Sequence, residues 1–253
     1  MQAQQYPTQR GWAWLKEGFE LWKKNPASLI FASFTYLLIL LIITAVPLIG
    51  QPIASLIMPI LSLSVLNTCR AVDEGRKAGP ELMLSGFKSQ MVGTLVTIGG
   101  FYLLGTIAAL ALTSLFDGGT LIGIMSGTIA LDPDAGLPNL TVPMLIAMTL
   151  SLPVLMAYWF APILAGWWRQ PAAKALFFSF YACAKNWRPF LAYGFALFIF
   201  MGLLPGIVVA VAGMIAPMLA TIMVLMMPMV LVPVTFASFY INARDVFGVN
   251  TSF

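Results

Sequence analysis

The fold of this chain is decided by residues 28–46, which read SLIFASFTYLLILLIITAV. The stretch carries no charge. It is long enough to cross a bilayer, because a membrane helix needs about 20 residues to span about 30 Å of hydrocarbon. Further uncharged apolar stretches follow it, and we expect membrane-spanning helices near 28–46, 53–69, 91–116, 142–168, 190–212 and 215–241. The predicted class is an all-α integral membrane protein with six transmembrane helices.

The composition agrees with a chain that is solvated by lipid. Of the 253 residues, 60% are hydrophobic and only 9% are charged, whereas roughly a quarter of the residues in a soluble domain are charged. Too few charged side chains remain to cover a water-facing surface. We therefore predict a single transmembrane domain over residues 1–253.

The positive charges are confined to the segments on one side of the predicted spans. These segments precede the first span, join the second to the third and the fourth to the fifth, and follow the sixth. The 13 cations are Arg10, Lys16, Lys23 and Lys24; Arg70, Arg76, Lys77 and Lys88; Arg169, Lys174, Lys185 and Arg188; and Arg244. Such a bias predicts that both termini are cytoplasmic. Residues 1–24 lack the apolar core of a signal peptide, so we expect the first span to be an uncleaved anchor.

The segment before the first span has the pattern of a surface helix. Trp12, Leu15, Phe19 and Trp22 recur at spacings of three and four residues, which is one face of a helix. A helix of this kind lies along the membrane surface with its apolar face down. Asn25-Pro26 should end it, since proline cannot continue the hydrogen-bond ladder.

The same pattern returns along the chain. Phe19 is followed by Lys24-Asn25 as Phe180 is followed by Lys185-Asn186, and Gly86-Phe87-Lys88 keeps part of the motif. Each pair of spans also closes on an arginine, at positions 70, 169 and 244. We predict three degenerate hairpin repeats over about 8–70, 80–169 and 171–245, each preceded by a cytoplasmic interfacial helix.

Few residues of this chain suggest chemistry. It contains no histidine, the commonest general base and metal ligand, and the predicted spans hold no charged residue of the kind that marks coupled carriers. We interpret Asp132-Pro133-Asp134 as a solvated turn, because calcium wants six to eight oxygen ligands. The methionines of the sixth span are interpreted as apolar filler. We expect no enzyme activity, no cofactor and no metal.

Basic and aromatic residues at matching places in the first and third repeats form the candidate site. It would bind lipid headgroups, with the cations meeting phosphate and the indoles lying at the depth of the glycerol. Its residues are Trp22, Lys23, Lys24, Lys185, Trp187 and Arg188. The alternative is that these cations only set the topology. Nucleic acid is a poor partner, because the basic residues flank membrane spans.

The run from Gly11 to Phe19, continued by Lys23-Lys24-Asn25-Pro26, resembles a group of uncharacterised bacterial inner-membrane proteins. That group is distantly similar to the membrane domain of some glycerophosphodiester phosphodiesterases. The resemblance concerns the membrane domain, so no catalytic residue carries over. It implies a multi-pass protein of the bacterial inner membrane, linked to lipid or envelope processes.

Two functions are compatible with these features. The first is a non-enzymatic scaffold or accessory subunit that binds lipid, predominantly anionic, or a membrane partner, including a second copy of the chain. The second is a transporter or channel for lipid-like or uncharged solutes. Prolines within the spans should kink the helices, and kinked helices serve either to pack or to gate a path. A membrane-depth cavity lined by Ser, Thr and Tyr would favour the transporter.

Overall fold

The computed structural model describes residues 3–126, 128–129 and 140–248, and the regular elements in these ranges are helices. Six helical stretches are long and apolar enough to cross a membrane, which confirms the predicted class and number of spans. They are α2 (Pro26–Thr44), α3 (Gly50–Asp73), α4 (Val92–Asp117), α6 with α7 (Thr141–Trp159, Ala161–Trp168), α9 with η2 and α10 (Trp187–Leu197, Phe198–Leu203, Leu204–Ile215), and α11 with α12 (Pro217–Met226, Pro228–Phe247).

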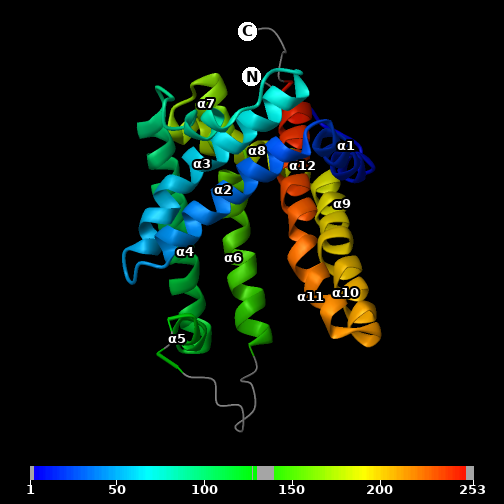
Figure 1. The fold of residues 1–253 in the computed structure, drawn as a ribbon. Helices are drawn as coiled ribbons and strands as arrows, with labels where there is room; N and C mark the ends of the chain where they lie inside the picture. The colour runs from blue at the N-terminus through cyan, green and yellow to red at the C-terminus, as the bar shows by residue number, and fades with distance from the viewer. Residues whose placement is uncertain (1–2, 127, 130–139, 249–253) are drawn as a thin grey trace.

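Shorter helices lie between or before the spans. They are α1 (Arg10–Lys24), η1 (Pro80–Leu84), α5 (Thr120–Met125) and α8 (Ala172–Lys185). Figure 1 shows α1, α7 and α8 at the end of the molecule where the chain also begins and finishes, while α5 lies at the opposite end. We call the first of these the basic end, because the segments that hold the 13 cations lie there.

Prolines lie where the spans are interrupted, since proline lacks the N–H that a helix interior needs. The break between α6 and α7 is followed by Pro162, and α12 begins at Pro228. The π-helical turn η2 ends at Leu203, two residues before Pro205. Pro59, in contrast, stays within α3, so the second span is continuous. Figure 1 shows α2 and α3 running obliquely across the other spans.

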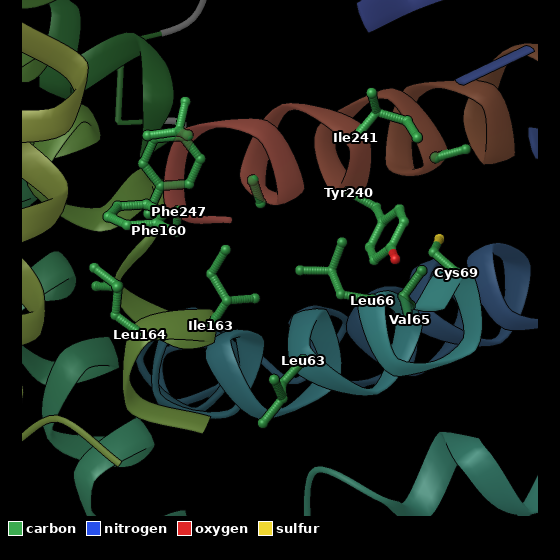
Figure 2. Close-up of a cluster of buried hydrophobic side chains, with 14 of the residues drawn as sticks. Leu63, Val65, Leu66, Cys69, Phe160, Ile163, Leu164, Tyr240, Ile241 and Phe247 are labelled. Atoms are coloured by element: carbon green, nitrogen blue, oxygen red, sulfur yellow. The ribbon is translucent and has the colours of Figure 1, made fainter. Parts of the chain in front are cut away.

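The buried core lies at the basic end, where α3, α7 and α12 meet. Figure 2 shows Leu66 of α3, Ile163 of α7 and Ile241 of α12 within this cluster. Tyr240 points from α12 toward Cys69 of α3. Away from this end burial is sparse: α6 and α11 have no fully buried residue, and α10 has only Ala212. The apolar side chains of these helices therefore face outward, as lipid-facing side chains do.

The short helices pack on the spans in a regular way. The 3₁₀ helix η1 packs on α2 and α3, α8 packs on the α6–α7 span and on α4, and α1 packs on α9 and α12. Thus η1 and α8 each pack on the pair of spans before them in the chain. The first helix, α1, packs instead on the last pair of spans. Each pair of spans therefore has one short helix packed on it, and the arrangement is cyclic.

Small residues allow these close contacts. A Cβ atom on Gly18 of α1 would overlap the backbone of Ser238, and one on Gly86 would overlap the backbone of Ile60. Ser179 of α8 stands at the matching position, directly before a phenylalanine. Its hydroxyl donates to the Met156 carbonyl at 2.8 Å and accepts from the Phe160 N–H at 2.8 Å.

Candidate functional site

An ionic network joins α1, α3 and α12 at the basic end. Arg10 contacts Asp245 at 2.5 Å and Glu17 at 2.6 Å. Arg244 contacts Asp73 at 2.8 Å and Glu17 at 3.3 Å, and Lys24 reaches Asp73 at 3.0 Å. The network has three cations and three carboxylates, so its charges balance. The sequence does not predict the network, because four of its five pairs join residues that lie 49 to 235 positions apart in the chain.

Neutral donors complete the network. The indole of the buried Trp14 donates to Asp245 at 2.9 Å, and the hydroxyl of Tyr240 donates to Asp73 at 3.1 Å. Burial raises the pKa of Tyr6, whose hydroxyl donates to the Asp245 carbonyl, and the charge of Asp245 raises it further. The hydrogen bond to Asp245 raises the pKa of Arg10, which therefore stays charged. This arrangement holds helices together and leaves its carboxylates paired.

A second ion-pair group follows α3. Glu74 is held between Arg70 at 2.8 Å and Arg76 at 2.5 Å. Burial alone would raise the pKa of Glu74, but the hydrogen bonds from Arg70 and Arg76 outweigh it and lower the pKa. The guanidinium of Arg70 also lies over the ring of Trp167, whose indole donates to Asn67 at 2.7 Å. The group links α3 to α7.

The predicted headgroup residues of the first repeat already have protein partners. Lys23 pairs with Glu20 at 2.6 Å and lies over Phe19, while Lys24 pairs with Asp73. Trp22 is half-buried and stacks on Phe19. These cations are therefore partly neutralised by neighbouring acids.

The predicted residues of the third repeat lack acidic partners within the described ranges. Lys185 donates to the Ala3 carbonyl at 2.8 Å, and Arg188 lies over the ring of Trp187, which is 54% exposed. The start of α1 packs on Pro189 at Gly11, so Lys23 and Lys24 lie at the other end of α1, roughly 20 Å away along the helix. The structure does not bring the two predicted sets together.

Residues 169–188 form an acid-free segment, because they include four cations and no Asp or Glu. None of the four makes an ion pair within the part of the chain that the structure describes. The segment also presents Phe177, which is 65% exposed, along with Tyr181 and Trp187. A hollow of about 510 Å³ lies against Lys174 and Phe177. Lys174 thus lies beside an exposed phenylalanine ring, and Arg188 lies over an exposed tryptophan ring.

A larger hollow lies between α1, η2 and α12. It has a volume of about 540 Å³, and we call it the α1 groove. Its lining consists of Trp12, Leu15, Lys16 and Phe19 of α1, Phe200 and Met201 of η2, and Val230, Leu231 and Val234 of α12. All of these side chains except Lys16 are apolar.

Hydroxyl groups converge within the first four spans. Tyr36 of α2 and Tyr158 of α6 both lie near Ser62 of α3, and Tyr158 packs on Tyr102 of α4 with ring centroids 4.7 Å apart. The buried Tyr158 hydroxyl has no hydrogen-bond partner in the described residues. These four residues are the hydroxyl cluster.

Other predicted features bear little on a site. Residues 3–126, 128–129 and 140–248 hold no cluster of three metal-ligating side chains, and Asp132-Pro133-Asp134 lies outside these ranges. Cys69 and Cys183 are buried free thiols, and burial raises the pKa of Cys183 to about 12. Such a thiol is unreactive at neutral pH.

Comparison with known proteins found a close match over nearly the full chain. A probable inner membrane protein from Burkholderia thailandensis is 34% identical over 256 residues, which cover 98% of this chain and 95% of that protein. No family model and no solved structure matches the chain. These comparisons do not show the expected similarity to glycerophosphodiester phosphodiesterases.

Proposed function

Because the chain belongs to the same family as the probable inner membrane protein of Burkholderia thailandensis, we propose that it is a non-enzymatic inner-membrane protein that binds anionic lipid. It would act as a scaffold or accessory subunit, with a membrane protein or a second copy of the chain as a further partner. The carrying observation is the acid-free segment. Its four cations make no ion pair in the described ranges, Lys174 lies beside the exposed Phe177, and Arg188 lies over the exposed Trp187. Each cation near an anionic membrane surface contributes about 1 kcal/mol of attraction.

The proposal includes an orientation with both termini in the cytoplasm. All 13 cations and six of the nine acidic residues belong to segments at the basic end. The other three, Asp117, Asp132 and Asp134, belong to the segment between the third and fourth spans, and in the sequence the other segments on that side carry no charge. In this orientation α1 and α8 lie along the inner membrane surface. Their exposed Trp12, Phe19 and Phe177 support this, since aromatic side chains favour headgroup depth.

The three hairpins are, in this proposal, copies of one unit. The cyclic packing of η1, α8 and α1 supports it, and so do the small residues at matching positions. Gly18 packs on Ser238, and the Gly86 N–H donates to the Ser64 hydroxyl at 3.0 Å. Ser64 and Ser238 each follow by five residues the proline of the matching span, Pro59 or Pro233. Equivalent contacts thus recur between different pairs of spans.

Two double variants test the lipid site. In Lys185→Gln/Arg188→Gln, two lysines are added elsewhere in residues 169–188 to keep the charge of the segment and hence the topology. We expect reduced retention of cardiolipin or phosphatidylglycerol in native mass spectrometry. The variant Lys23→Gln/Lys24→Gln, compensated in the same way within residues 1–24, should lose less lipid, because these two lysines already form ion pairs with Glu20 and Asp73. Unchanged retention in the first variant would mean that Lys185 and Arg188 only orient the chain.

The hydroxyl cluster favours transport as a second candidate function. Hydroxyl groups at membrane depth can replace the water around an uncharged polar solute, and the Tyr158 hydroxyl has no partner in the described residues. Tyr158→Phe in proteoliposomes would then slow efflux of small polyols. If proteoliposomes with the unmodified protein release polyols no faster than empty liposomes, such a path is excluded.

A further inference from the structure

We propose that the α1 groove binds one anionic phospholipid, with an acyl chain between α1, η2 and α12 and the phosphate at Lys16. The inference rests on the proposed function for the lipid class and the orientation. It adds a second, separate site to the surface of the acid-free segment.

The position of the groove fits an acyl chain. Gly18 of α1 packs on Ser238, which lies six residues before Arg244, or roughly 9 Å along α12. Val234 and Leu231, in the lining, lie four and seven residues further from the basic end, or roughly 6 and 10 Å. The groove therefore starts beneath α1 and leads toward the middle of the membrane, as a lipid tail does.

The walls of the groove are apolar and its upper rim is aromatic. The ring of Trp12 meets those of Phe195 and Phe200 edge to face, with centroids 6.2 and 6.0 Å apart. Trp12 and Phe19 are still 40% and 41% exposed, so the protein covers them only in part. The volume of about 540 Å³ lies within the range of about 300–1,000 Å³ that is usual for small-molecule sites.

Lys16 supplies the charge that selects an anionic lipid. It is exposed and makes no ion pair within the residues that the structure describes. The nearest acids in α1 are already engaged: Glu17 with Arg10 and Arg244, and Glu20 with Lys23. A phosphate at Lys16 would thus meet a free ammonium rather than competing carboxylates.

The wall of the groove also includes the π-helical turn. Phe200 and Met201 in the groove wall both belong to η2, Phe198–Leu203. π-Helical turns are rare and frequently lie at functional sites. Here it lies against the groove, where the widened turn shapes the wall that a lipid tail would contact.

The test uses the full-length protein in mild detergent, titrated with phosphatidylglycerol or phosphatidylcholine and followed by native mass spectrometry. Leu231→Trp fills the groove and should reduce the binding of the first phosphatidylglycerol by about tenfold. Lys16→Gln should reduce the preference for phosphatidylglycerol over phosphatidylcholine by about fivefold, the loss of one favourable charge contact. Lys16 is exposed, so this second variant should fold even if the tryptophan variant does not.

The matched controls are Val224→Trp, an exposed apolar position of α11 outside the groove lining, and Lys88→Gln, an exposed lysine outside the network. Neither should change binding. Equal loss in variant and control, or an unchanged preference in Lys16→Gln, would overturn the groove site. If Lys185→Gln/Arg188→Gln loses lipid while Lys16→Gln does not, the groove site fails and the proposed function stands. The opposite result would retain the groove and remove the acid-free segment.

Discussion

Asp73 is the residue at which the first and last parts of the chain meet. Its carboxylate accepts from Lys24 of α1 and from Arg244 and Tyr240 of α12. We expect Asp73→Asn to lower the free energy of unfolding by about 1–3 kcal/mol, because it leaves partly buried donors without a charged acceptor. Thermal unfolding in detergent measures the effect. Glu20→Gln breaks only the exposed pair with Lys23 and should cost less than about 1 kcal/mol; similar losses in both variants would contradict the assigned role of Asp73.

Glu74 should make stability depend on pH. Its pKa is lower in the folded protein than its ordinary value of 4.5, because Arg70 and Arg76 stabilise the carboxylate against the effect of burial. The contribution is therefore present above about pH 4.5 and is lost as the pH falls through the folded pKa. Melting curves of the natural chain and of Glu74→Gln should differ at pH 7 and converge in acid. A difference in melting temperature that grows as the pH falls would contradict the predicted direction of the pH dependence.

Single residues were the least predictable part of the site. The sequence placed Lys24 and Lys185 at matching positions of a repeat. Only the structure shows that Lys24 pairs with Asp73, while Lys185 donates to a carbonyl and has no ion-pair partner in the described ranges. Such a difference depends on contacts between helices that are distant in sequence. The pattern of charge along a chain does not specify these contacts.

At the scale of elements, Gly18 decides how α1 docks. A Cβ atom there would overlap the backbone of Ser238, so Gly18→Ala should push α1 away from α12 and cost about 1–3 kcal/mol of stability. Gly194→Ala is the matched control, since a Cβ atom on that helical glycine meets no atom within 4 Å. Protease cleavage within residues 3–25 should accelerate in the first variant and not in the second. Equal cleavage would indicate that α1 does not depend on this contact.

The helices themselves were largely predictable, and their interruptions less so. Apolar length identified the six spans, and the spacing of Trp12, Leu15, Phe19 and Trp22 identified α1, which ends at Lys24 before Asn25-Pro26 as expected. Pro59 did not break α3, whereas Pro228 begins a new helix. A proline acts according to whether its neighbours can accommodate the missing hydrogen bond. That depends on packing rather than on the proline itself.

For the whole molecule, the proposed orientation predicts which positions an impermeant thiol reagent reaches on intact cells. Asp117→Cys should react, while Lys77→Cys should react only after the membrane is opened. Cys69 and Cys183 are buried, so the natural chain serves as the unlabelled control. If Lys77→Cys reacts on intact cells and Asp117→Cys does not, the orientation is the reverse of the proposed one.

The overall class and the number of spans followed from the sequence, because lipid solvation demands long apolar helices whatever their packing. The α1 groove did not, since it needs α1 to lie across η2 and α12, which are about 180 residues or more away in the chain. Amphipathic spacing predicted that α1 lies on a surface but not which spans it covers. Long-range docking therefore decided where the candidate sites lie.

The packing of α1 on α9 and α12 also has a consequence for biosynthesis. The ribosome releases α1 well before its partner helices α9 and α12. Until α12 is made, the apolar face of α1 lacks part of its cover, and Arg10 lacks Asp245. The docking of α1 is thus delayed until the chain has been made through α12. In a chain that is truncated before α12, α1 would lack this partner helix. An incompletely docked α1 would thus distinguish a truncated chain from one that contains α12.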